Sequence, residues 1–196
     1  MNNNQISNRT FTKLSKIWYH GTSSEYFDSL SNNIDLSQCK EYTDFGKGFY
    51  LTSNFNQASK HAENRVAFEG EAIVFVFELN IGKLKSDFSS KIWVEMNPEW
   101  SDFIYLNRSK LETFTHGYDY VYGGVADGKI HTVIKNRDQG RIDSETFYKY
   151  VCNYPNYDQL SIHNQEIFDY NIINKIGVVN AYVKSKQYNG IKELGS

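Results

Sequence analysis

Apolar residues recur along the chain in short stretches, and their spacing alternates between the period of a strand and that of a helix. A strand is predicted at 16–20, where aromatic and β-branched residues lead into a turn at Gly21. The apolar run at 72–79 is too short for most helices and predicts a central strand. Further strands are predicted at 118–125, 129–134, 157–163 and 176–184, the first two joined through Asp127-Gly128.

Three segments have helical spacing behind a recognisable start signal. Asn54 is expected to cap a helix with Phe55, Ala58, Ala62 and Val66 on its apolar face. Pro98 opens a second helix, whose apolar face would carry Trp100, Phe103, Ile104 and Leu106 or nearby positions. Ser144 is the expected cap of a third. Because short strands outnumber helices and do not alternate with them strictly, the fold class predicted is α+β.

The 196 residues predict a polar N-terminal extension at 1–15 followed by one domain over 16–194. Hydrophobic residues form 40% and charged residues 22% of the chain, as in a folded globular protein. The formal net charge of -2 lacks the basic footprint of a protein that grips nucleic acid. The N-terminus has no signal-peptide pattern and no apolar run is long enough to span a bilayer, so we expect a cytoplasmic protein without membrane contact.

Several common catalytic motifs are missing or incomplete. Asp44-Phe45-Gly46 spells the metal-binding tripeptide of protein kinases, but no HRD loop accompanies it. Dinucleotide-fold and phosphate-loop glycine patterns, HExxH and Gly-x-Ser-x-Gly do not occur. Cys39 and Cys152 are too few for a disulfide scaffold. We therefore expect no metal.

A three-part constellation remains. His20 is expected at a strand end, with Gly21 exposing backbone beside it and Thr22 at the turn. Tyr50 begins a second strand behind the Gly46-Lys47-Gly48 turn, and Gln159 lies on a third, far downstream. Each taken singly has a structural explanation as a core histidine, a packed aromatic or a strand amide. Their order along the chain carries more information than any one of them.

The segments YHGT, DFGKGFYLT, EWSDFIYLNR, YDYVYGGVADG and DQLSIH resemble the ADP-ribosyltransferase superfamily, in its His-Tyr-Glu branch with diphtheria toxin and the poly-ADP-ribose polymerases. More narrowly, they are similar to a bacterial domain family of unassigned function, often described beside small partner genes in toxin-antitoxin-like pairs. The resemblance covers roughly residues 17 to 170. It implies a split β-sandwich with flanking helices and a cleft that holds NAD as substrate.

The resemblance also implies roles for individual residues. His20 would hydrogen-bond a ribose hydroxyl of NAD, backbone groups of Gly21 would pair with the nicotinamide amide, and Tyr50 would stack on the nicotinamide ring. Thr22 and Gly48 would complete the binding surface. Lys47 would reach a phosphate or stand as a solvated turn lysine, and Arg108 would contact pyrophosphate or tie a helix to the sheet. Asp44 would fix the loop before Tyr50, whereas Asp119 and Asp127 would shape turns.

Gln159 departs from the pattern, which has Glu at this place. Breaking the nicotinamide–ribose bond leaves a sugar cation, which a carboxylate stabilises better than a neutral amide does. Three outcomes stay open: Asp158 adds the charge, the enzyme is slow, or the activity is not standard. If charge is what the site lacks, Gln159→Glu should raise hydrolysis. Tyr157 replaces the acidic or amide residue of arginine-modifying transferases, so arginine is not the expected acceptor.

The sequence thus predicts an NAD-dependent mono-ADP-ribosyltransferase with catalytic residues His20, Tyr50 and Gln159, acting on an unknown macromolecule. A role as a bacterial or phage toxin, held by a small antitoxin-like partner, follows from the resemblance alone. Two alternatives stay open. One is a non-catalytic NAD or ADP-ribose binding module, and the other is an NAD-dependent RNA 2′-phosphotransferase-like enzyme.

Overall fold

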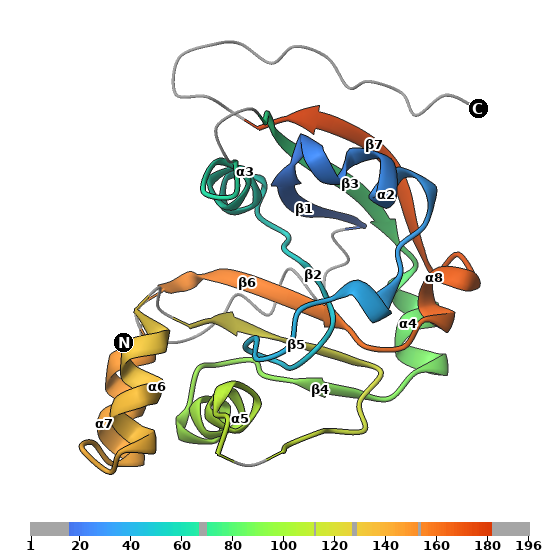
Figure 1. Cartoon of the computed structure of the whole chain (residues 1–196). Coiled ribbons are helices and arrows are strands. Elements are labelled where there is room, and N and C mark those ends of the chain that lie inside the picture. Colours follow the sequence, from blue (N-terminus) through green and yellow to red (C-terminus); the bar gives the residue numbers. More distant parts are fainter. Residues whose placement is uncertain (1–15, 67–69, 112, 127–128, 153, 182–196) are drawn as a thin grey trace.

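The computed structural model describes residues 16–66, 70–111, 113–126, 129–152 and 154–181, which form two β-sheets and seven α-helices (Figure 1). The first sheet is antiparallel in the order β1-β3-β7, with β1 Ile17–Ser23, β3 Ala72–Leu79 and β7 Ile173–Asn180. The second has the order β2-β6-β5-β4, with β2 Phe49–Leu51, β6 Tyr154–Ile162, β5 Tyr120–Val125 and β4 Ser90–Ile92. Only the β4–β5 pair of that sheet is parallel among the described pairings. Two sheets with helices around them confirm the α+β class.

The helices lie outside the sheets (Figure 1). Their bounds are α2 Phe27–Asn32, α3 Phe55–Glu63, α4 Ile81–Asp87, α5 Pro98–Arg108, α6 Ile130–Asp138, α7 Ser144–Val151 and α8 Glu166–Asp169. Two short 3-10 turns, η1 Ser24–Tyr26 and η2 Leu36–Gln38, flank α2. Helix α3 packs on β1 and β3, whereas α5, α6 and α7 gather beside the second sheet. In the described ranges, no helix is long and apolar enough to cross a bilayer.

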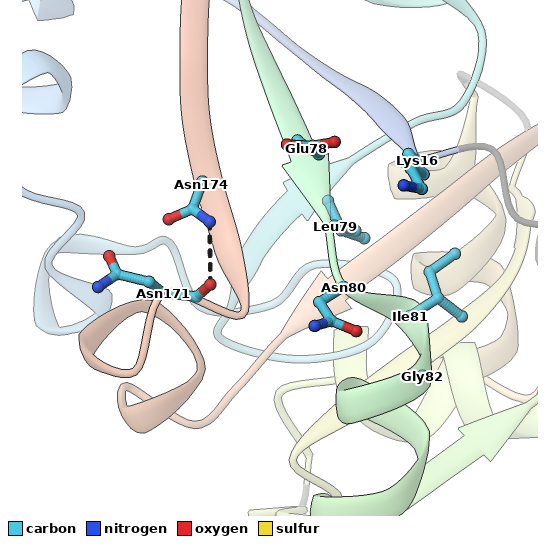
Figure 2. A pocket seen from close by; sticks show the side chains of 8 residues that line it. All are labelled: Lys16, Glu78, Leu79, Asn80, Ile81, Gly82, Asn171 and Asn174. Atoms are coloured by element: carbon cyan, nitrogen blue, oxygen red, sulfur yellow. Dashed lines mark hydrogen bonds between the residues drawn. The ribbon is translucent and has the colours of Figure 1, made fainter.

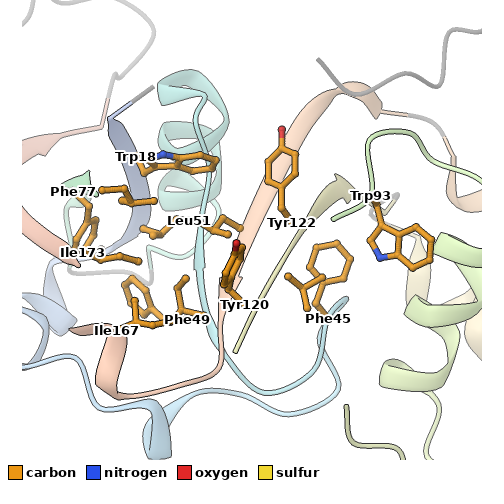
Figure 3. Close-up of a cluster of buried hydrophobic side chains, with 14 of the residues drawn as sticks. Trp18, Phe45, Phe49, Leu51, Phe77, Trp93, Tyr120, Tyr122, Ile167 and Ile173 are labelled. Carbon is orange, nitrogen blue, oxygen red and sulfur yellow. The ribbon is translucent and has the colours of Figure 1, made fainter. Parts of the chain in front are cut away.

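Hydrophobic side chains fill both faces of the second sheet (Figure 3). On the face toward the first sheet, Tyr122 meets Trp18 edge to face with ring centroids 6.1 Å apart, and Phe49 meets Phe77 at 5.7 Å. On the other face, Phe45 packs near Phe103 of α5 at 6.1 Å. The second sheet is therefore buried on both sides.

Most predicted elements are confirmed. The central strand at 72–79 and the helix begun by Pro98 occur as expected. The helix capped by Asn54 also occurs, but it ends at Glu63, so Val66, which was predicted on its apolar face, lies beyond it. The strands predicted at 118–125, 157–163 and 176–184 also occur. β5 begins two residues later than predicted, whereas β6 and β7 each begin three residues earlier and end at 162 and 180. The 1–15 extension and the Asp127-Gly128 connection lie outside the described residues.

Four further local predictions are wrong. Residues 130–134 belong to helix α6, with Lys129 as its N-cap, because Ile130 and Ile134, four apart, both turn inward. Strand β1 does not end at Gly21 but runs to Ser23, which pairs with Ala72. The α7 cap is Asp143, whose Oδ1 accepts from Thr146 N at 2.8 Å.

The fourth concerns the inner face of α5, where Leu106 is not part of the buried stripe. Its side chain is 37% exposed, and Asn107, 6% exposed, turns inward instead. The Asn107 amide is satisfied because Nδ2 donates to the Phe103 carbonyl at 2.9 Å. A polar residue can thus occupy the buried position when its own helix provides the partner.

Candidate functional site

The two sheets meet at one pair of residues and then separate. Tyr19 N donates to Thr52 O at 2.8 Å, and Thr52 N donates to Tyr19 O at 2.9 Å. In an antiparallel ladder the next hydrogen-bonded pair would be Gly21 with Tyr50. That pair does not form, because Nδ1 of His20 donates instead to Tyr50 O at 2.7 Å. The β1–β2 ladder therefore splits at His20.

The split leaves the main chain of Gly21 without its strand partner. Along β1 the main-chain N–H and C=O groups of successive residues point alternately toward β3 and toward β2. Those of Tyr19 point toward β2, where they bond Thr52. The N–H and C=O of Gly21, two residues later, therefore also point toward β2 and away from β3. Within the described residues these two groups have no main-chain partner. A buried glycine here presents one donor and one acceptor side by side.

His20 is neutral and has one nitrogen free for a ligand. Burial lowers the pKa of His20 to about 4, although its hydrogen bond to the Tyr50 carbonyl acts in the opposite direction. Since Nδ1 carries the proton for that bond, Nε2 is an acceptor. Among the described residues Nε2 has no partner, and it is not one of the fully buried unpaired atoms. The ring stacks on Phe49 with centroids 4.4 Å apart.

Tyr50 is held by the segment before it. Its hydroxyl accepts from Phe45 N at 2.8 Å, donates to Gly46 O at 2.9 Å, and lies 2.8 Å from Thr43 Oγ1. Burial raises the pKa of Tyr50, so the phenol stays protonated at neutral pH. The partly buried ring is stacked near Phe45, and stacking on a ligand remains a prediction.

Gln159 is on the same face of the second sheet as Tyr50. Tyr50 pairs with Ser161, two residues along β6, so both side chains point toward the 43–46 segment. Nε2 of Gln159 donates to Asp44 Oδ2 at 2.7 Å and to Gly124 O at 2.8 Å. The structure therefore links all three predicted residues through hydrogen bonds around one segment, without bringing imidazole, phenol and amide into direct contact.

Asp158 faces the other side of β6 and ties together the turn before α3. Its Oδ1 accepts from Thr52 Oγ1 at 2.7 Å and Ser53 N at 2.9 Å, and Oδ2 accepts from Ser53 Oγ at 2.6 Å and Tyr122 OH at 3.2 Å. Four donors satisfy this buried carboxylate and hold β6 to the start of α3. A contribution of its charge to catalysis stays a prediction.

The remaining predicted residues have mixed placements. Thr22 is buried within β1 rather than at a turn, and Lys47 is exposed. Gly48 passes so close to β6 that a Cβ would lie 2.7 Å from Ile162 O. Arg108 donates from Nε to Asp44 Oδ1 at 2.6 Å, which ties α5 to the loop before β2 rather than to the sheet, and its contact with a pyrophosphate stays a prediction. Asp119 accepts from Ser89 N at 2.7 Å and shapes a turn.

Two histidines that sequence reasoning did not single out clamp the same loop. His116 Nε2 donates to Phe45 O at 2.7 Å, and His163 Nδ1 donates to Lys47 O at 2.8 Å. Their rings meet edge to face at 4.6 Å. Burial lowers the pKa of His163 to about 4. Their partners lie 71 and 116 residues away in sequence, so no local pattern could reveal them.

These pKa values predict an acid-sensitive fold. The folded-state pKa of His20 and of His163 is about 4, below the ordinary 6.5, so the unfolded chain binds more protons between these values. Stability is fully present above pH 6.5 and is lost as pH falls toward 4, by up to about 1.4 kcal/mol per pH unit for each histidine. Urea unfolding from pH 7.5 to 4.5 measures this slope.

The histidine contribution is isolated by substitution. His20→Gln and His163→Gln should each flatten the slope relative to the unchanged protein, whereas His131→Gln, at an exposed position on α6, should not. If the free energy of unfolding changed with pH equally in all four proteins, the pH dependence would come from groups other than His20 and His163.

A surface depression of about 410 Å³ lies at another place, where β3 passes into α4 (Figure 2). It is lined by Lys16, Glu78, Leu79, Asn80, Ile81, Gly82, Asn171 and Asn174. Glu78 pairs with Ile17, four residues or about 13 Å along β1 from Gly21. None of the predicted site residues lines it.

A family model described as "Protein of unknown function (DUF3990)" matches residues 16–172. The chain belongs to this family. The match spans nearly the same residues as the motifs that carry the resemblance noted above, and the description assigns the DUF3990 family no activity. Neither the curated proteins nor the solved structures yield a match.

Proposed function

We propose that this DUF3990 member is an NAD-dependent mono-ADP-ribosyltransferase of the split β-sandwich type, with its nicotinamide site at the β1–β2 split. The observation that carries the proposal is that, among the residues the structure describes, the N–H and C=O of Gly21 and the adjacent Nε2 of His20 have no partner. A primary carboxamide has one acceptor and one donor on the same side, so it pairs with such a backbone edge. Nicotinamide is a ligand with this group.

The chain supplies the groups that the reaction needs around that edge. The bond between ribose C1′ and the nicotinamide nitrogen breaks, and its electron pair goes to the nitrogen, neutralising the pyridinium. An acceptor nucleophile then bonds to C1′ and loses its proton. His20 Nε2 would accept from a ribose hydroxyl, and Gln159 would hold the sugar near the developing cation. The acceptor is a macromolecule, and the toxin role with a small protein partner is part of the same proposal.

The neutral amide at 159 favours a second candidate, a module that binds NAD or ADP-ribose without turnover. The Gln159 amide retains a hydrogen-bond acceptor, but it stabilises a positive charge less than a carboxylate would. The site would then recognise the nucleotide through the same Gly21 edge. Binding measured together with nicotinamide release separates the two candidates.

The test uses purified protein with NAD, following nicotinamide release by chromatography and binding by calorimetry. We expect release above buffer, and we expect His20→Asn to weaken NAD binding at least about tenfold, because the asparagine amide can still donate to the Tyr50 carbonyl but nothing replaces the Nε2 contact. His131→Asn on α6 is the matched control and should bind normally. Binding without release would support the module, and absence of both would exclude the NAD site.

A further inference from the structure

Asp44 forms the centre of a buried polar network beneath Gln159. It is 4% exposed, and both carboxylate oxygens are occupied. Oδ1 accepts from Arg108 Nε at 2.6 Å, while Oδ2 accepts from Gln159 Nε2 at 2.7 Å and from Ala126 N at 3.2 Å. Three segments separated by tens of residues therefore converge on one carboxylate.

This network determines which way the Gln159 amide points. Its NH₂ group has two hydrogens, and both are used, one by Asp44 Oδ2 and one by Gly124 O. Turning the amide by 180° would place Oε1 against two acceptors, which is repulsive. Oε1 has no partner among the described residues and is not among the fully buried unpaired atoms. The amide is thus held with its acceptor directed to the accessible side.

The same contacts explain why position 159 carries an amide. A glutamate there would bring a second carboxylate to within hydrogen-bonding distance of Asp44, with no hydrogen for either Asp44 or Gly124 unless it stayed protonated. Arg108 already compensates the charge of Asp44 from the opposite side. Two buried carboxylates and one guanidinium would leave a net negative charge in the core.

We propose that Asp44 is the positioning residue for Gln159: it orients the amide so that Oε1 faces the ligand, and its charge requires a neutral side chain at 159. The catalytic part of this inference rests on the proposed function, whereas the pairing part does not. It reverses the expectation from sequence for Gln159→Glu, which should damage the protein rather than improve it.

The pairing is tested by a stability cycle of the unchanged protein, Asp44→Asn, Gln159→Glu and the double variant. At pH 8, Gln159→Glu should lower the Tm by about 8 °C. Asp44→Asn should lower the Tm of the unchanged protein but raise that of Gln159→Glu, since the new amide can donate to the new carboxylate. Gln139→Glu, the same change at an exposed position, should leave the Tm within about 1 °C. Equal losses from Asp44→Asn in both backgrounds would overturn the pairing.

Orientation is tested by turnover. Asp44→Asn should lower nicotinamide release about tenfold while NAD binding changes less than threefold, because only the aim of the amide is lost. In a Gln159→Ala background the same change should have no further effect, which a merely structural role would not produce. An undiminished loss in that background would overturn the positioning role. If the unchanged protein releases no nicotinamide, the proposed activity fails, and the stability cycle still decides the pairing.

Discussion

Gly21→Ala is expected to destabilise the protein by at least about 3 kcal/mol. A Cβ at this position would lie 1.9 Å from Ala58 O, 2.7 Å from Ala58 C and 3.1 Å from Ala62 N. These are main-chain atoms of α3, so no side-chain rotation can relieve the overlap. Helix α3 would have to move away from β1, and its buried Ala58 and Ala62 would lose their contacts with the first sheet.

Chemical unfolding monitored by circular dichroism measures this loss. Gly82→Ala is the matched control, because Gly82 is inside α4 and its Cβ would come no closer than 3.6 Å to Asn80 Oδ1. Replacing that helical glycine should stabilise the protein by about 0.5 to 1 kcal/mol. If the two variants had similar stability, α3 would not pack on Gly21 as described. NAD binding by any folded Gly21→Ala protein should also be lost.

Arg108→Met is expected to cost about 3 to 5 kcal/mol, because it leaves the carboxylate of Asp44 buried without its countercharge. The arginine side chain is 17% exposed and that of the aspartate 4%, so water cannot replace the lost partner. Methionine keeps most of the stem that packs along α5. The side chains of Tyr50 and Gln159 should become mobile together, because Phe45 N binds the Tyr50 hydroxyl and the adjacent Asp44 binds the Gln159 amide.

The comparison is Lys149→Met, which breaks an ion pair of similar length on the surface. Lys149 Nζ lies 2.7 Å from Glu145 Oε1, but the side chains are 68% and 74% exposed. That change should leave the free energy of unfolding nearly unchanged, because solvent screens an exposed ion pair. Equal effects of the two substitutions, measured by urea unfolding, would contradict the structural role of Arg108 and reopen its assignment to a pyrophosphate.

Local signals in the sequence predicted the elements whose stabilising partners are nearby. Asn54 caps α3 and Asn97 caps α5 just before Pro98, and in each case the acceptor and the donor are three residues apart. The segment 129–134 failed because β-branched residues suggested a strand, while burial of one face over 130–138 favours a helix. Tertiary packing overrides such weak intrinsic preferences.

The sequence motifs identified the residues of the candidate site, but they did not predict which way the side chains point or what they contact. The alternation at 157–163 suggested a strand with one solvated face, yet Asp158, Gln159 and Ser161 are all buried. The 43–46 segment and α5 cover the face that would otherwise be exposed. The partner of Gln159 is 115 residues away, and no spacing rule along one chain predicts such a contact.

The sequence by itself determined the α+β class, the central strand and two helix starts, because these depend on neighbours within a few positions. Only the tertiary structure decided that the β1–β2 ladder splits at His20 and that Asp44 takes both the guanidinium of Arg108 and the amide of Gln159. Hydrogen bonds between distant segments depend on how the sheets pack, and a buried polar group must find its partner wherever that packing places one.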